Sequence, residues 1–301
     1  MNITGFHLEL TNICTLKCLG CARTQFRSIF PDCWENHNIN KDKLLNFLDI
    51  DLDNILFILC GNYGDPIYHP EFLEIVKLLK QRNARVKIVT NGSYKTQEWW
   101  ESLTEMLDER DLIMFGVDGT PENFTMYREN ADWKSIEIGM KVVAKSVCDS
   151  KWIFIPFNYN ENDISEVEQL SKKIGIKSFE VRPSDRFDEY TNHLKPVNEL
   201  VGPRDKDNAK WKQGEEISKI YPKCNSNNEH FITSDGYYSP CCYINDFRFY
   251  YKTPFGLDKE KYDISKTTIT KLLNEQTTKD FMNNLNNHRV CQLNCSNICN
   301  E

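Results

Sequence analysis

The chain alternates between short apolar runs and longer segments in which apolar residues recur at helical spacing. Residues 54–60 ("NILFILC") have the length and composition of a buried strand, and residues 70–81 ("PEFLEIVKLLKQ") show helical spacing behind a proline. The same order repeats along the chain. Strands are expected at residues 5–10, 54–60, 84–90, 112–117, 152–157 and 176–181. Helices are expected at residues 70–81, 96–109, 132–147 and 163–174.

Strands that alternate with helices predict a parallel sheet with right-handed crossovers. Six such units are fewer than the eight of a closed barrel. The expected fold class is therefore α/β, a partial (βα)6 barrel of the TIM type. In such folds ligands bind at the carboxyl ends of the strands. The polar and cysteine-containing segments fall there, at residues 14–21, 61–66, 90–92, 118–119, 158 and 182.

The alternation stops after Pro183, and the rest of the chain has a different composition. Residues 184–222 are polar and contain no cysteine, which predicts a linker or a lid. Residues 230–242 predict a hairpin around a Ser-Asp-Gly turn, and a helical stretch is expected near 277–287. The expected domains are a barrel at 1–183, the linker or lid at 184–222, and a small hairpin-plus-helix cluster-binding domain at 223–301.

Charge and cysteine content narrow the classes of function. The net charge of −7 disfavours a nucleic-acid partner, because an acidic surface repels phosphate backbones. No apolar run approaches the length of a membrane helix, and the N-terminus does not read as a signal peptide. We therefore expect a cytoplasmic protein without a membrane partner. In a reducing compartment its 12 cysteines favour metal binding or redox chemistry over disulfides.

Three cysteines, Cys14, Cys18 and Cys21, follow the first expected strand within eight positions. Their spacing also fits one face of a helix, but Thr11 and Asn12 are weak helix formers. A structural zinc site takes four ligands, and no fourth ligand is nearby. An iron–sulfur cube held by three thiolates has one iron without a protein ligand. That iron is open to a small molecule, which makes the missing ligand a site of chemistry.

This Cys-x3-Cys-x2-Cys motif, behind the first strand of a six-unit partial barrel, resembles the radical S-adenosylmethionine (radical SAM) superfamily over roughly residues 5–182. The resemblance implies that Cys14, Cys18 and Cys21 hold a four-iron four-sulfur cluster whose open iron binds SAM. An electron from the cluster then cleaves SAM to methionine and a 5′-deoxyadenosyl radical, which abstracts a hydrogen atom from the substrate. It also implies a reducing partner such as flavodoxin or ferredoxin.

Other strand ends resemble the family in part. "GNYGDP" (61–66) is similar to its Gly-Gly-Glu-Pro turn, and "TNG" (90–92) fits the pattern after the third strand. Gly116 stands where the family carries a serine, and Gly20 where an aromatic residue often precedes the third cysteine. The expected SAM-binding residues are Gly64, Asp65, Asn91, Asp118, Asn158 and Arg182. For Asn158 and Arg182, a polar side chain facing water is the alternative.

A second group of cysteines resembles the SPASM/twitch extension of some radical SAM enzymes, in which a hairpin and a C-terminal cysteine pair hold an auxiliary four-iron four-sulfur cluster. The ligands that the resemblance implies are Cys224, Cys241, Cys291 and Cys295, with Cys299 able to replace Cys295. A zinc site is the competing interpretation of this group. Three roles stay open for Cys242: a spare thiol, a catalytic proton acceptor, or a ligand in place of Cys241.

These observations lead to two classes of function. The first is a radical SAM enzyme that oxidises a small molecule or peptide, or forms a bond in it. The second is a non-catalytic iron–sulfur or zinc protein that transfers electrons or binds a partner. A mere electron carrier needs neither the six-unit barrel nor the glycine turns, so the first class is favoured.

Overall fold

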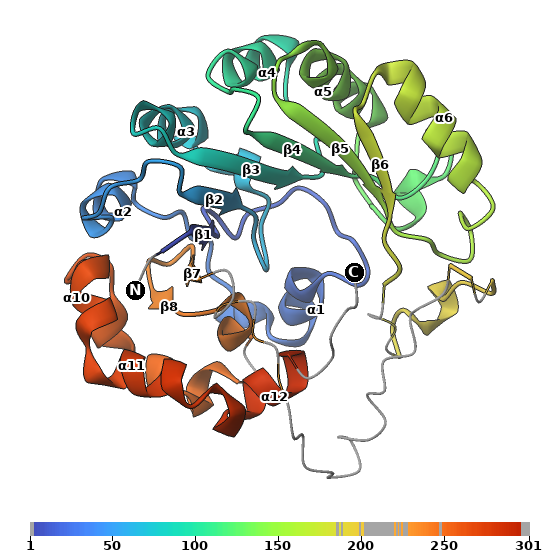
Figure 1. Cartoon of the computed structure of the whole chain (residues 1–301). Coiled ribbons are helices and arrows are strands. Elements are labelled where there is room, and N and C mark those ends of the chain that lie inside the picture. The colour runs from blue at the N-terminus through green and yellow to red at the C-terminus, as the bar shows by residue number, and fades with distance from the viewer. Residues whose placement is uncertain are drawn as a thin grey trace.

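The computed structural model describes residues 3–184, 187, 189–198, 200–201, 220, 222, 224, 228–246 and 249–295. In this part of the chain eight strands form one curved sheet in the order β6-β5-β4-β3-β2-β1-β7-β8 (Figure 1). The strands are β1 (Gly5–Leu8), β2 (Leu56–Leu59), β3 (Arg85–Thr90), β4 (Leu112–Gly116), β5 (Asp149–Phe154), β6 (Ser178–Val181), β7 (Glu229–Ile232) and β8 (Tyr238–Ser239). All neighbours are parallel except β7 and β8. The six expected strands and the partial barrel are confirmed.

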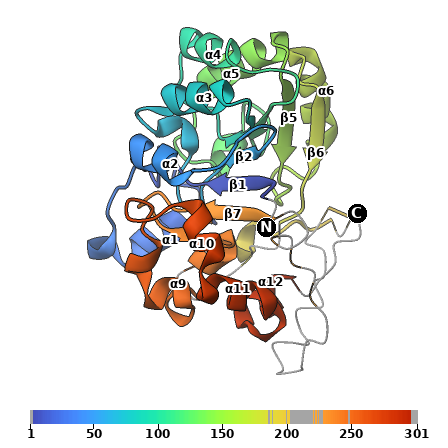
Figure 2. The same cartoon turned by 60° about the vertical axis from the view of Figure 1, so that its left-hand side comes forward.

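Helices surround the convex side of this sheet. Figure 1 shows α2 to α6 around the outside of β1 to β6, and α10 to α12 continuing this outer ring past β7 and β8; Figure 2 shows the same layers from the side. The helices are α1 (Ala22–Ile29), α2 (Lys41–Phe47), α3 (Phe72–Gln81), α4 (Gln97–Thr104), α5 (Trp133–Lys145), α6 (Ile164–Ile174), α9 (Pro254–Leu257), α10 (Ile269–Asn274), α11 (Gln276–Asn283) and α12 (Arg289–Cys295).

Local signals explain where these elements begin and end. Thr96 and Asp132 accept hydrogen bonds from the backbone N–H groups of Trp99 and Ser135, and so cap α4 and α5. The expected strand at 152–157 is displaced toward the N-terminus. It ends before Pro156, which has no N–H to donate to a neighbouring strand. α1 and α2 were not expected, because neither has a long apolar periodicity.

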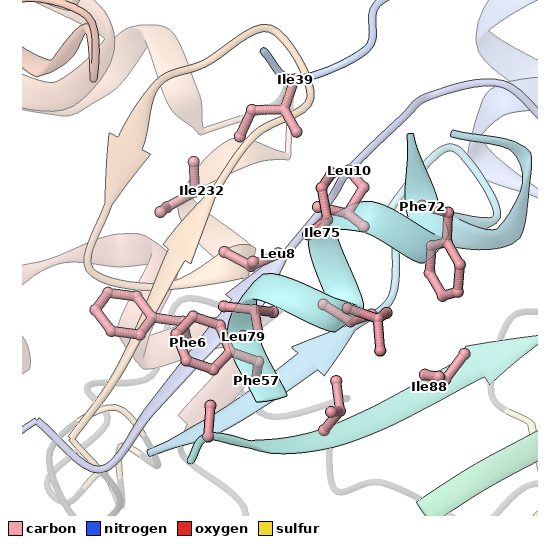
Figure 3. Close-up of a cluster of buried hydrophobic side chains, with 14 of the residues drawn as sticks. Phe6, Leu8, Leu10, Ile39, Phe57, Phe72, Ile75, Leu79, Ile88 and Ile232 are labelled. Carbon is pink, nitrogen blue, oxygen red and sulfur yellow. The ribbon is translucent and has the colours of Figure 1, made fainter. Parts of the chain in front are cut away.

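The main core lies between the convex face of the sheet and the helices. Phe6 on β1 and Phe57 on β2 are fully buried, and their rings stack with centroids 5.3 Å apart. Ile75 and Leu79, one turn apart on α3, lie over the same strands (Figure 3). Burial of each such side chain contributes about 1.5–3 kcal/mol. This packing fixes β1, whose C-terminal end leads into the cysteine loop.

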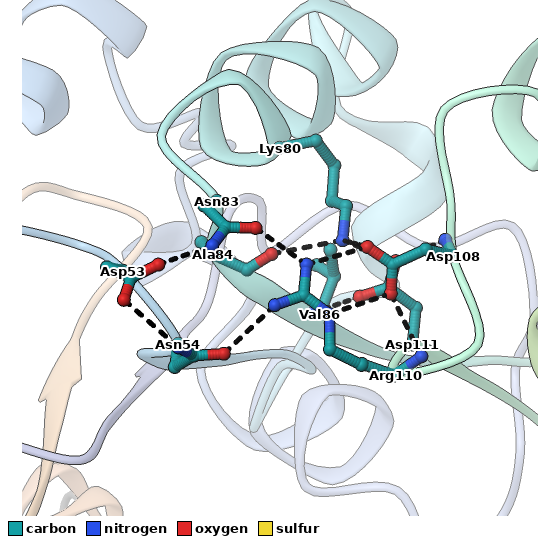
Figure 4. Close-up of polar contacts among 9 residues, drawn as sticks. All are labelled: Asp53, Asn54, Lys80, Asn83, Ala84, Val86, Asp108, Arg110 and Asp111. Carbon is teal, nitrogen blue, oxygen red and sulfur yellow. Dashed lines mark hydrogen bonds and ion pairs between the residues drawn. The ribbon is translucent and has the colours of Figure 1, made fainter.

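A polar network closes the opposite end of the barrel, where β3 and β4 begin (Figure 4). Asp111 accepts the backbone N–H of Val86 at 2.7 Å and forms an ion pair with Lys80 at 2.6 Å. Arg110 donates to the side chain of Asn54 at 2.9 Å. In barrels of this type the N-terminal face serves stability and the C-terminal face serves chemistry. The network therefore belongs to the scaffold.

The C-terminal hairpin is part of the barrel sheet. β7 pairs in parallel with the free edge of β1, with Phe6 opposite His230. β8 returns antiparallel, with Ile232 opposite Tyr238, through a turn in which Gly236 has φ of +86°. The expected hairpin is confirmed, and it continues the sheet on the side of the cysteine loop. The proposed domain boundaries stay a prediction, and most of the expected linker lies outside the described residues.

Candidate active site and metal centres

The segment that carries Cys14, Cys18 and Cys21 is a loop at the C-terminal end of β1. Thr11 pairs with Asn38 in an isolated antiparallel bridge, so the segment between these two residues begins and ends at the same place on the barrel rim. Cys14 and Cys18 precede α1, and Cys21 is the residue directly before its first turn. The interpretation of three cysteines on one face of a helix is therefore wrong. The three thiols belong to one loop.

The surroundings of these thiols favour a bound positive group. Burial raises the pKa of Cys14 to about 12, and nearby Asp65 raises it further. Burial raises the pKa of Cys18 to about 11, although the neighbouring Arg128 lowers it. The Cys14 sulfur is 3.5 Å from the backbone nitrogen of Leu16 and 3.6 Å from the side-chain amide nitrogen of Asn91, which donate to it. Thiolates form here most readily when a metal cluster compensates their charge.

The turn at residues 61–66 is locked against the cysteine loop. A Cβ atom at Gly64 would overlap the backbone carbonyl of Thr11, so only glycine fits there. The backbone N–H of Asp65 donates to the carbonyl of Ile13 at 3.0 Å. From below, the carboxyl group of Glu9 accepts the N–H of Tyr63 at 2.7 Å. The turn therefore sets the position of the loop that carries the thiols.

Asp65 braces the neighbouring turn after β3. Its carboxyl group accepts the backbone N–H of Asn91 at 2.7 Å and the hydroxyl of Thr90 at 3.0 Å. Burial raises its pKa to about 6, and these hydrogen bonds oppose the rise. The structure thus brings together Gly64, Asp65 and Asn91 beside Cys14. Their contacts with SAM stay a prediction.

Asp118 is paired with an arginine that the sequence did not single out. Its carboxyl group accepts the backbone N–H of Ile155 and the Nε–H of Arg128, both at 2.8 Å. The guanidinium group of Arg128 lies against Gly116, where a Cβ atom would be 2.9 Å from Nη2. The side chain of Arg128 is 16% exposed, and its charge acts on Cys18. Arg128 thus takes the space beside the position where the family carries a serine.

An aromatic side chain also reaches the loop from elsewhere in the chain. A Cβ atom at Gly20 would be 2.9 Å from the hydroxyl of Tyr127. The ring of Tyr127 packs against Phe157, with centroids 4.4 Å apart. Neither Tyr127 nor Arg128 shows a sequence signal, because both lie in the irregular segment after β4. Position 20 is a glycine where the family often has an aromatic residue, and the ring of Tyr127 lies beside it.

The remaining expected SAM-binding residues have partners of their own. The side-chain amide of Asn158 donates to the carbonyl of His193 at 2.6 Å. Arg182, the residue directly after β6, pairs with Glu180 of that strand at 2.6 Å and is half exposed. Arg182 thus lies at a strand end as expected, whereas Asn158 lies four residues beyond Phe154, the last residue of β5. Their contact with SAM also stays a prediction.

Five cysteines of the second group lie close enough to influence one another. The thiol of Cys241 is hydrogen-bonded to those of Cys224 and Cys242, and these bonds hold its pKa well below the usual value. Cys291 and Cys295 lie one turn apart on α12, and both act electrostatically on Cys241 and on Cys224. In the described part of the chain, no three His, Cys, Asp or Glu side chains converge as they would around one metal ion. Cys299 lies outside the described residues.

This second group lies beside the C-terminal ends of β1 and β2. The side-chain amide of Asn62 donates to the carbonyl of Cys242 at 3.3 Å. His7, on β1, contacts the carbonyl of Cys60 at 2.9 Å, and the charge of Cys241 acts on its ring. Both cysteine groups therefore border the rim of the same barrel.

The types of side chain in both places are those that hold iron–sulfur clusters, although the described ones do not converge as around a single metal ion. The first group offers three thiols, with the N–H donors of Leu16 and Asn91 and the cation of Arg128 nearby. The second offers four thiols with the N–H groups of Tyr243 and Ile244 directed at Cys241. Thiolate ligands with surrounding N–H donors are the usual setting of these clusters.

The sequence matches the radical SAM superfamily over residues 8–174, more than half of the chain. The chain belongs to this superfamily, and its cofactors are therefore SAM and a four-iron four-sulfur cluster. The protein is an enzyme, so the non-catalytic alternative is set aside. The auxiliary cluster and the individual ligands remain predictions.

Similar proteins agree with the fold. The tungsten-containing aldehyde ferredoxin oxidoreductase cofactor-modifying protein of Pyrococcus furiosus is 31% identical over 119 residues, which are 38% of this chain and 31% of that protein. The match thus spans less than a third of that relative. SuiB of Streptococcus suis bound to S-adenosylmethionine superposes with a TM-score of 0.59 at 14% identity, covering 97% of this chain and 77% of that one. SuiB bound to precursor peptide SuiA gives 0.62 at 11% identity, covering 97% and 70%.

Among the described residues, no helix is both long and apolar enough to cross a bilayer.

Proposed function

We propose that this radical SAM enzyme removes a hydrogen atom from a small molecule or peptide and completes a net two-electron oxidation or an oxidative bond formation. The observation that carries the proposal is the position of the second cysteine group. It borders the rim of the barrel beside β1, the strand that leads into Cys14, Cys18 and Cys21. A second redox centre in this place suits a reaction in which the substrate radical loses an electron.

Cys14, Cys18 and Cys21 would hold the SAM cluster. When bound and reduced, this cluster supplies the electron that cleaves SAM to methionine and a 5′-deoxyadenosyl radical. Asn91 donates to the Cys14 sulfur and so orients that ligand. Arg128 places a buried cation beside Cys18, suited to the carboxylate of SAM. Gly64 allows the backbone of the 61–66 turn to approach the loop closely.

Cys224, Cys241, Cys291 and Cys295, or Cys299 in place of Cys295, would hold the auxiliary cluster. The chemistry that it would supply there is the acceptance of one electron. The proposed oxidation would take from the substrate one hydrogen atom, one electron and one proton, and the proton needs a base. Cys242 is the candidate base because of its place, since its backbone is tied to Asn62 at the rim. Its hydrogen bond to Cys241 and its burial raise the pKa of its thiol, so it must lose its own proton before it can accept one from the substrate. A flavodoxin or ferredoxin would supply the reducing electron.

The names of similar proteins support both substrate classes. The Pyrococcus relative is named for modifying the cofactor of another enzyme, and one structure of SuiB contains a precursor peptide. A small molecule and a peptide therefore both remain within the proposal.

The experiment follows the two half-reactions separately. Cys224→Ala should reduce product formation far more than it reduces SAM cleavage, because hydrogen abstraction precedes the loss of the electron. Cys148→Ala is the matched control, a buried cysteine outside both groups. With a substrate deuterated at the reacting carbon, each turnover should yield one deuterated 5′-deoxyadenosine. Deuterium returning to SAM, or a product at the oxidation level of the substrate, would contradict the oxidation.

A further inference from the structure

The concave face of the barrel sheet carries charged side chains. On β3, Val86 and Ile88 are fully buried on the convex side, so Lys87 between them lies on the concave face. The same alternation places Lys151 of β5 on that face, because its neighbour Trp152 packs outward. Side chains inside a small barrel of this type usually fill it with apolar groups. Here several are charged and only partly buried.

Electrostatic interactions agree with this placement. Lys87 interacts with Lys151, on β5, and with Arg182, directly after β6. β3 is separated from β5 and β6 by β4 in the sheet. The side chains can therefore reach one another only across the concave face, where the curved sheet brings distant strands together (Figure 1).

One carboxylate satisfies two of the three cations. Glu180 pairs with Lys151 at 2.9 Å and with Arg182 at 2.6 Å. Lys87 makes no ion pair or hydrogen bond with another of the described residues. Burial and the two neighbouring cations lower its pKa, and the weaker effects of the Glu229 carboxylate and the Cys60 thiol oppose this shift. A partly buried ammonium group without a partner is unfavourable unless an anion joins it.

We propose that Lys87 binds an anionic group of the substrate, a carboxylate or a phosphate, inside the barrel. The proposal rests on the proposed function and names the substrate class for the same site. Lys87 precedes Thr90 by three residues, so it lies roughly 10 Å below the rim at the rise of a parallel strand. A substrate held there by its charged end would extend toward the cysteine loop with its reacting carbon.

The test measures anion binding, which requires no turnover. Reconstituted protein with SAM is titrated anaerobically with glycerol 3-phosphate, with succinate, and with uncharged glycerol. At least one of the two anions should bind saturably, and glycerol should not. Lys87→Met should weaken binding at least about tenfold, the loss expected for a charge-assisted hydrogen bond. Comparing the two anions shows whether phosphate or carboxylate is preferred.

Three further variants sharpen the test. Glu180→Gln removes the carboxylate that pairs with Lys151 and Arg182 and should tighten anion binding, because both cations then also face the anion. Lys87→Arg keeps the charge and should bind within about threefold of the wild type. Lys77→Met removes an exposed lysine on the outside of α3 and should change nothing. The inference is overturned if neither anion binds saturably, or if Lys87→Met and Lys77→Met bind alike. If SAM cleavage is intact in the wild type, such a result leaves the proposed function standing. Loss of SAM cleavage in the wild type would refute the proposed function instead.

Discussion

The two cysteine groups border the same barrel rim but are built differently. The first lies on one continuous loop, Cys14 to Cys21, held by the 61–66 turn and by residues 37–39. The second joins Cys224 and Cys241, on either side of the β7–β8 hairpin, to two cysteines of α12. A three-thiol loop leaves one iron of a cube open to SAM. A four-thiol site closes its cluster and leaves electron transfer or structural support as its use.

The largest expected effect separates the two groups by SAM cleavage. Cys14→Ala, Cys18→Ala or Cys21→Ala should each reduce 5′-deoxyadenosine formation by at least about a thousandfold, because the cluster that binds and reduces SAM loses a ligand. Cys224→Ala should retain measurable cleavage. The check is chromatographic measurement of 5′-deoxyadenosine after reduction with dithionite. Retained cleavage in any of the first three variants would refute the assignment of that loop.

Variants of Arg128 test whether its charge only stabilises the buried Asp118 or also binds SAM at the first cysteine group. Arg128→Met leaves Asp118 buried and unpaired, which should lower the free energy of unfolding by about 3–5 kcal/mol. The double variant Arg128→Met/Asp118→Asn removes both charges and should recover most of that stability. Its affinity for SAM should nevertheless stay at least about tenfold weaker, as measured by equilibrium dialysis. Full recovery of SAM binding in the double variant would show that Arg128 only supports Asp118.

Gly64 tests whether the 61–66 turn positions the cysteine loop. In Gly64→Ala the new methyl group would overlap the Thr11 carbonyl, and the backbone must move. The expected loss is about 3 kcal/mol in urea unfolding, with a marked fall in SAM cleavage. Gly175→Ala, at the end of α6 with φ of +99°, should cost about 1 kcal/mol and leave cleavage unchanged. Equal loss of SAM cleavage in the two variants would contradict a local role for the turn.

Glu9 gives the smallest effect, a dependence of stability on pH. Burial raises its pKa in the folded protein from 4.5 to about 7, against the hydrogen bonds that it accepts. Between these values the folded state keeps a proton that the unfolded state has released. The resulting contribution to stability is complete below pH 4.5 and is lost as pH rises through 7.

Glu9→Gln keeps a neutral side chain at all pH values. Between pH 5 and pH 8.5 it should therefore gain about 2 kcal/mol of unfolding free energy relative to the wild type. Urea unfolding at the two pH values measures this difference, with the exposed Glu166→Gln as the matched control. A difference that does not change with pH would mean that Glu9 is ionised throughout.

The barrel was predictable because its signals are local. Each of the first six strands has its own apolar run, and the end of β3 is marked by Asn91-Gly92. The pairing of β7 with β1 was not predictable, because no feature of residues 229–232 indicates which strand they pair with. The position of a parallel neighbour depends on the whole fold.

The residues of the candidate site likewise divide into those that have a local sequence signal and those that have none. Cys14, Cys18 and Cys21 carry their own spacing, whereas Arg128 is a single arginine in an irregular segment. Glu9 accepts hydrogen bonds from backbone N–H groups, and such a contact cannot be inferred from the types of the residues involved. On β3 the alternation of Arg85 and Lys87 with Val86 and Ile88 did carry a signal for the charged interior. Lys87 follows that pattern, although it was not among the expected site residues.

The most direct test of two separate clusters is the metal content of anaerobically reconstituted protein. We expect about eight irons per chain with negligible zinc, and about four in the Cys14/Cys18/Cys21→Ala triple variant. Cys33→Ala, an exposed cysteine outside both groups, should keep the wild-type content. A wild-type protein with about four irons and one zinc, of which the triple variant keeps only the zinc, would contradict this expectation.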